Sequence, residues 1–180
     1  GSARSQNSSG HLLGHVRDTG ADAKNFKTRI YQTNARQSFH TDSCDAVGLL
    51  CLKKAKNGGS SMLASSVTAY NEIAKRRPDL LPSLFEPVAY DRRGENKKGE
   101  QEFFTIPVFN WFENHLTCIY HRTYVDSAQR FENAPKLTQG QKEALDLLDE
   151  LLNDSSIHFE MELEPGDMQF VYNHNLLHDR

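Results

Sequence analysis

The sequence is poor in cysteine and contains no long apolar run. Its three cysteines, Cys44, Cys51 and Cys118, form no C-x-x-C pair, which argues against a disulfide-stapled secreted scaffold and predicts a reducing, cytoplasmic setting. The longest apolar stretch, residues 47–52, is far shorter than the roughly 20 residues that cross a membrane as a helix. We therefore expect a soluble protein without a membrane partner.

An excess of charge of one sign is also missing. The chain of 180 residues carries 21 Lys and Arg against 24 Asp and Glu, a net charge of −3 at pH 7. This balance gives no electrostatic basis for binding nucleic acid, so we expect no nucleic-acid partner, and homo-oligomer formation is left open. Hydrophobic residues make up 37% and aromatic residues 9% of the chain, which suffices for the core of one domain.

The first ten residues differ in composition from the rest. Gly1 and Ser2 are typical of a remnant left by an expression vector, and residues 3–10 are rich in serine. We predict a disordered tail over residues 1–10 and one domain over residues 11–180.

The hydrophobic pattern predicts more strands than helices. A helix is expected over 65–77, and a second over 138–153, where Thr138 and Gln141 form a capping box ahead of a leucine-rich face. Strands are expected over 46–52, 103–109, 116–120, 157–163 and 168–172, with a charged loop over 92–99. Many short strands with two inserted helices predict a mainly β fold of the sandwich or jelly-roll type.

Two short segments carry residues that can bind a metal. In His40-Thr41-Asp42, an imidazole and a carboxylate two residues apart can reach one ion, and a distant histidine would complete the facial triad of Fe(II) oxygenases. A capping or surface pair is the open alternative. His174 and His178 follow an apolar strand, and strand alternation places both on one face, so the pattern does not choose between them.

Several motifs, taken in order, resemble one enzyme family. The segments are Phe39-His40-Thr41-Asp42, Gly58-Gly59-Ser60-Ser61, Pro165-Gly166-Asp167, Asn173 and His178. Together they resemble the taurine-dioxygenase-like enzymes over about residues 12–180. The resemblance implies a double-stranded β-helix, the jelly roll of this family, that uses Fe(II), 2-oxoglutarate and O₂.

The resemblance also implies roles for individual residues. His40, Asp42 and His178 match the three iron ligands, because the final ligand of the family lies five residues after the asparagine, here Asn173. His174 is then a neighbour of the site. Ser61 matches the hydroxyl that contacts the carboxylate of 2-oxoglutarate, whereas a plain turn at the two glycines is the competing interpretation.

One element of the family pattern is not found. The family holds 2-oxoglutarate with an arginine well beyond the last histidine, and Arg180 lies too close to His178 for that role. The family's N-terminal segment is also not matched. We therefore expect a β-helix domain truncated at both ends and incomplete at its C-terminus.

Two residues are candidates for contacting the substrate. Arg122 could pair with an acidic substrate or form a surface salt bridge, and Trp111 could line the pocket or belong to the core. The expected activity is oxidation, as hydroxylation, of a small molecule with release of succinate and CO₂. Alternatives are a catalytically inactive jelly-roll scaffold and a cupin-like metal protein that does not use 2-oxoglutarate.

Overall fold

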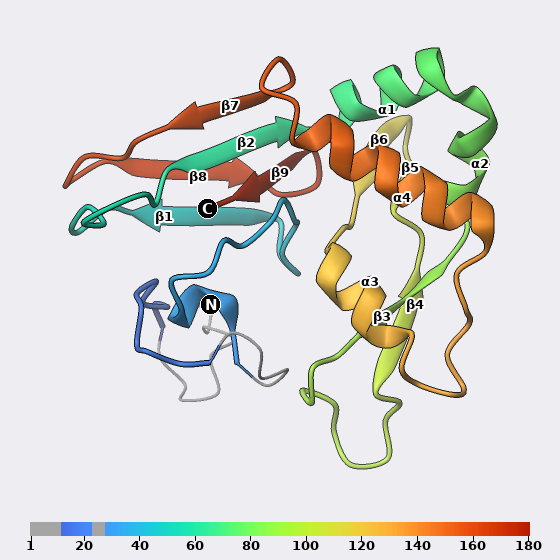
Figure 1. The fold of residues 1–180 in the computed structure, drawn as a ribbon, viewed down its shortest axis with the longest axis horizontal. Helices are drawn as coiled ribbons and strands as arrows, with labels where there is room; N and C mark the ends of the chain where they lie inside the picture. Colours follow the sequence, from blue (N-terminus) through green and yellow to red (C-terminus); the bar gives the residue numbers. More distant parts are fainter. Residues whose placement is uncertain (1–11, 23–27) are drawn as a thin grey trace. The chain divides into compact units, whose positions relative to one another are not determined.

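The computed structural model describes residues 12–22 and 28–180, which fall into two units, 1–37 and 38–180. The tail expected over residues 1–10 lies outside the described residues. In the first unit the 3-10 helix η1 (Ile30–Gln32) is joined to the preceding segment by a hydrogen bond from the Thr19 amide to the Gln32 carbonyl, 2.8 Å long. All further elements belong to the second unit (Figure 1).

Two antiparallel sheets carry the strands nearest the site. β1 (Ala46–Leu50) pairs with β8 (Met168–Tyr172). In the other sheet β2 (Ser61–Ser65) is central, with β7 (His158–Met161) and β9 (Leu176–Asp179) on its two sides. The strands predicted over 46–52, 157–163 and 168–172 are thus confirmed, the first two shorter than expected, whereas β2 and β9 were not predicted.

Two hairpins and three short helical segments also belong to this unit. β3 (Val88–Asp91) pairs with β4 (Phe103–Ile106), and β5 (Phe109–Phe112) pairs with β6 (His115–Cys118). The single strand predicted over 103–109 is wrong, because Pro107, which has no amide hydrogen to donate to a ladder, separates β4 from β5. The unpredicted helical segments are η2 (Pro78–Leu80), α2 (Leu81–Leu84) and α3 (Arg122–Ala128).

Both predicted helices are confirmed. Ser65 caps α1 (Ser66–Arg76), and the capping box of Thr138 and Gln141 begins α4 (Gln139–Leu152). The apolar face of α4 is fully buried in a core that also contains Ile73 of α1 and Leu177 of β9. This core joins the helices to the strand that carries His178.

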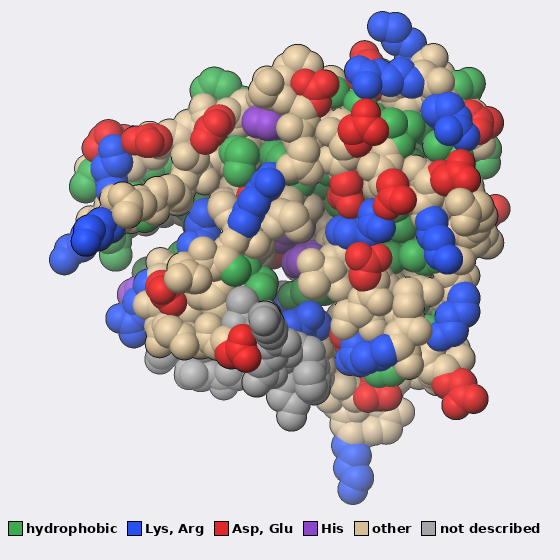
Figure 2. All heavy atoms as spheres, viewed as in Figure 1, with side chains coloured by type: hydrophobic (Ala, Val, Ile, Leu, Met, Phe, Trp, Pro, Cys, Tyr) green, Lys and Arg blue, Asp and Glu red, His purple; other side chains and the backbone are tan. Residues whose placement is uncertain are grey.

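The exposed side of the helices carries charges of both signs. Figure 2 shows Lys and Arg interspersed with Asp and Glu over the region of α1, α2 and α4. One acidic residue of α4 has a partner in the interior: Asp149 accepts a 2.6 Å hydrogen bond from the hydroxyl of buried Tyr120. Among the described residues, no helix is both long and apolar enough to cross a membrane.

Candidate metal centre

His40 and His178 lie opposite each other in an antiparallel bridge. Each amide donates to the other residue's carbonyl at 3.0 Å. Directly opposed residues of such a pair project to the same side, and the ring centroids are 4.2 Å apart. Residues separated by most of the chain are therefore brought side by side because β9 runs next to the segment that precedes β1.

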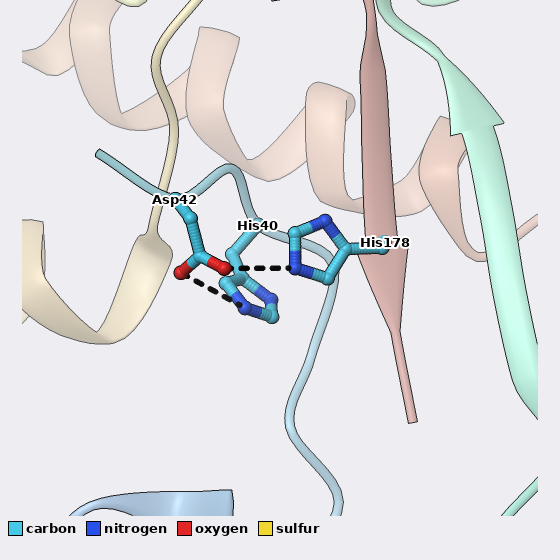
Figure 3. Close-up of side chains that lie close together, drawn as sticks. All are labelled: His40, Asp42 and His178. Carbon is cyan, nitrogen blue, oxygen red and sulfur yellow. Dashed lines mark ion pairs between the residues drawn. The ribbon is translucent and has the colours of Figure 1, made fainter. Parts of the chain in front are cut away.

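The Asp42 carboxylate faces both imidazoles from one side (Figure 3). Its Oδ1 is 3.9 Å from Nε2 of His40, and its Oδ2 is 3.5 Å from Nε2 of His178. One ligand atom from each of the three residues lies within 4.8 Å of the others. His40 is buried and Asp42 half exposed, so the site opens toward solvent on its carboxylate side.

The backbone of Asp42 is held by the side-chain amide of Asn173. The Asp42 amide donates to Oδ1 of Asn173 at 2.8 Å, and Nδ2 of Asn173 donates to the carbonyls of Asp42 and Cys44. On the other side, the Thr41 amide donates to the carbonyl of Tyr120, and the Tyr120 amide donates back to Oγ1 of Thr41. These bonds fix the direction of the Asp42 side chain without contacting its carboxylate.

The electrostatics of the site suit a divalent metal. Burial, together with the neighbouring His178 ring, lowers the pKa of His40 to about 4, so its imidazole is neutral at pH 7. Nδ1 of His40 is 2.9 Å from the carbonyl of Ser38, which can only accept, so Nε2 carries the free lone pair. Desolvation disfavours ionisation of Asp42, but its hydrogen bond to His178 and the adjacent imidazoles outweigh this and lower the pKa of the carboxyl.

These residues fit Fe(II). Two imidazole nitrogens and one ionised carboxylate on one side of a point are the donor set of the 2-His-1-carboxylate triad, which leaves positions open for other ligands. His178, and not His174, meets His40 and Asp42. His174 instead makes a 2.9 Å contact with Oδ1 of the exposed Asp45.

A third histidine next to the site was missed in the sequence. His121 also bridges to His40, with ring centroids 5.0 Å apart, and its own ring stacks on Tyr124 at 3.7 Å. No spacing in the sequence relates His121 to His40, so only the fold reveals this neighbour. The ring packs against His40 and helps to hold its orientation.

The other predicted site residues lie apart from the three ligand atoms. Ser61 is buried and donates to Oε1 of Gln169 at 2.7 Å. Arg122 forms ion pairs with Asp126, Asp146 and Asp149. Trp111 is 58% exposed and meets Tyr70 edge to face. Substrate binding by Arg122 and Trp111 stays a prediction.

Gly58 and Gly59 have a conformational reason to be glycine. Both have positive φ, +65° and +82°, and a Cβ on Gly59 would come within 2.9 Å of the Cβ of Ala55. The turn therefore requires glycine at Gly59 whether or not a ligand approaches it.

A hollow lies beside the Asp42 carboxylate. It has a volume of about 260 Å³ and is lined by residues that include Cys44, Ile119, Asn173 and His174. A small molecule placed there would lie next to Asp42, one of the three candidate metal ligands.

Replacing Asn173 with alanine is expected to weaken metal binding about 10- to 100-fold, the usual effect of removing a group that orients a ligand. The three bonds that fix the backbone around Asp42 would be lost, while the three ligand side chains remain. Anaerobic titration with Fe(II) measures the effect. The matched control is Asn153→Ala at the end of α4, where binding should not change; an equal loss in both variants would contradict the orienting role.

Comparisons with known proteins agree with this geometry. A family model described as "Taurine catabolism dioxygenase TauD, TfdA family" matches residues 1–180. FR-33289 synthase of Streptomyces rubellomurinus is 37% identical, with 100% of this chain and 53% of that protein covered. Uridine-5'-phosphate dioxygenase of an Amycolatopsis species is 27% identical, with 83% of this chain and 56% of that protein covered. The chain thus spans about half the length of these curated relatives.

Solved structures establish the fold. The non-heme iron oxygenase OrfP in complex with Fe and alpha-ketoglutaric acid superposes with a TM-score of 0.66 at 16% identity, covering 95% of this chain and 50% of that one. Asparagine oxygenase in complex with Fe(II), 2S,3S-3-hydroxyasparagine and succinate gives 0.63 at 16% identity, covering 83% and 45%. The predicted mainly β jelly roll with inserted helices is confirmed.

Proposed function

Because the chain belongs to the taurine catabolism dioxygenase family TauD/TfdA, we propose that it carries the iron-binding part of an Fe(II)- and 2-oxoglutarate-dependent dioxygenase. His40, Asp42 and His178 are the metal ligands in this proposal. The reaction is hydroxylation of a small molecule by O₂: one oxygen atom enters the substrate, and the other enters succinate as 2-oxoglutarate loses CO₂. The location in the cytoplasm stays a prediction.

The observation that carries the proposal is the convergence of three ligand atoms within 4.8 Å of one another. Bound there, Fe(II) with 2-oxoglutarate would supply the oxidising chemistry, as cofactors do in such enzymes. The chain's own task is to keep His40 neutral, Asp42 ionised and both in fixed orientations. The contacts of Ser38 and Asn173 serve this task.

The small-molecule substrate is supported by the hollow beside Asp42 and by the relatives. Its volume is about 260 Å³, which offers space for a small molecule beside Asp42. One relative is named uridine-5'-phosphate dioxygenase, and the structure of asparagine oxygenase is in complex with hydroxyasparagine. Both molecules are small and polar. We propose that this chain, too, acts on a small polar molecule.

The proposal is tested by adding Fe(II) and 2-oxoglutarate to the protein without oxygen. A weak visible charge-transfer band is expected, because the keto acid would chelate the bound iron. Admission of O₂ with candidate substrates should then yield succinate. Stable iron binding with neither band nor succinate would contradict the proposal and favour the inactive scaffold or the cupin-like protein.

A further inference from the structure

Gln169 and Ser61 form a buried polar pair between the two sheets. Gln169 belongs to β8 and is 7% exposed, and Ser61 begins β2 and is 6% exposed. The Ser61 hydroxyl donates to Oε1 of Gln169 at 2.7 Å. The bond fixes the rotation of the amide, and Nε2 therefore points away from Ser61.

Nε2 of Gln169 is buried and has no hydrogen-bond partner among the described residues. Buried polar groups in folded proteins are almost always hydrogen-bonded, because leaving a donor unpaired forfeits its bonds to water. A buried donor that none of the described residues satisfies is available to an acceptor from a bound molecule.

The pair lies on the side of the sheet that carries His178. In the register of β2 and β9, Leu63 is opposite His178, and Ser61 shares the face of Leu63 because it is two residues away. Ala64 and Leu177 occupy the other face and pack in the helical core. A strand rises about 3.3 Å per residue, so Ser61 lies about 7 Å along β2 from Leu63, the residue opposite His178.

The distance of about 7 Å along β2, from the position opposite His178 to Ser61, is comparable to the length of a short dicarboxylate. One end of such a molecule could then reach the metal centre. We propose that Nε2 of Gln169 donates a hydrogen bond to the remote carboxylate of 2-oxoglutarate, and that Ser61 is a positioning residue that orients the amide. The inference rests on the proposed function and deepens it. It changes the role implied by the family resemblance, since the hydrogen of the Ser61 hydroxyl is already used by Gln169.

The test compares two ligands that differ only at the remote carbon. Calorimetry on the protein loaded with Mn(II), which does not turn over, gives the dissociation constants of 2-oxoglutarate and of 2-oxopentanoate, where a methyl group replaces that carboxylate. Gln169→Leu should weaken 2-oxoglutarate binding about 10- to 100-fold, the range for a hydrogen bond to a charged group. Binding of 2-oxopentanoate should not change.

Ser61 is tested by a double-mutant cycle. Ser61→Ala should weaken 2-oxoglutarate binding less than Gln169→Leu does, because the amide keeps its N–H groups but loses its fixed orientation. The double variant should be no weaker than Gln169→Leu alone, since Ser61 acts through the amide. Independent, additive losses would overturn the positioning role.

The matched control is Gln141→Leu, which removes another buried glutamine, in the capping box of α4. Its thermal unfolding temperature should fall, but the ratio of the two ligand affinities should not change. Should Gln169→Leu not fold, Gln169→Met keeps the side-chain length without the amide.

The outcomes separate the two proposals. Equal losses for both ligands, or no loss for either, overturn the role of Gln169 and leave the proposed function intact. Failure of the unchanged, metal-loaded protein to bind 2-oxoglutarate overturns the proposed function and this inference with it.

Discussion

Replacing Asp42 with alanine is expected to abolish metal binding. Asp42 supplies the only negative charge among the three ligands, and its two oxygens lie 3.9 and 3.5 Å from the two imidazole nitrogens. Two neutral imidazoles alone would neither balance the charge of the ion nor complete the triad. The loss should exceed the roughly 10- to 100-fold effect of removing an orienting group. Metal content after anaerobic dialysis measures it.

Two neighbouring residues provide the controls. Asp45 is only three residues away and its side chain is 94% exposed, so Asp45→Ala should keep the metal. His174→Ala should likewise keep it, whereas His178→Ala should lose it. If His174→Ala lost the metal and His178→Ala retained it, the ligand assignment would be wrong.

Replacing Asp91 with alanine is expected to lower the free energy of unfolding by about 3 kcal/mol. Asp91 is 1% exposed at the end of β3 and accepts hydrogen bonds from Ser127 of α3, from Arg130 and from the Arg93 amide. Breaking a buried ion pair costs about 3–5 kcal/mol, and the lower end applies because the Arg130 side chain is 42% exposed. Denaturant unfolding measures the change.

The Asp91 contribution should depend on pH in a defined direction. Burial raises the pKa of the carboxyl, but the hydrogen bonds from Arg130 and Ser127 outweigh it, so the pKa in the folded state is below its ordinary value. The stabilisation is therefore present above the unfolded pKa of about 3.9 and is lost as the pH falls through the folded pKa. The difference between wild type and Asp91→Asn should shrink below about pH 4.

A surface carboxylate serves as the comparison for Asp91. Glu162 pairs with Lys54, but its side chain is 69% exposed, so Glu162→Ala should change the unfolding free energy by less than about 1 kcal/mol. A loss for Asp91→Ala as small as this would contradict the role of Asp91 in joining β3 to α3. That junction matters for the site because α3 begins directly after His121.

The helices were predictable because their signals are local. The capping box of Thr138 and Gln141 lies within one turn, and the leucines of α4 repeat at helical spacing. The strands were predicted less well, because the burial of a strand residue depends on which other elements pack on that face of the sheet. Alternation in 157–163 predicts that Phe159 faces inward, yet Phe159 is 64% exposed in β7, which is at the edge of its sheet.

By itself the sequence determined the ligand types and the family pattern. The pair of His40 and Asp42 is local, since only Thr41 separates them. The order of motifs along the chain led to the jelly roll that the solved structures confirm. The position of Ser61 two residues after Gly59 could also be taken from the sequence. Its hydrogen-bond partner, Gln169, could not.

Strand alternation left His174 and His178 open and the family resemblance pointed to His178, but only the tertiary structure shows why His178 meets the pair. In one continuous strand His174 and His178 would share a face, but β8 ends at Tyr172 and β9 begins at Leu176. His174 therefore lies in the turn between the two strands, whereas His178 lies in β9. His178 reaches His40 because β9 pairs with β2 and bridges to the segment before β1. Gln169 of β8 meets Ser61 of β2 through a side-chain contact between the two sheets. Such contacts depend on sheet register between remote segments, which no local spacing encodes.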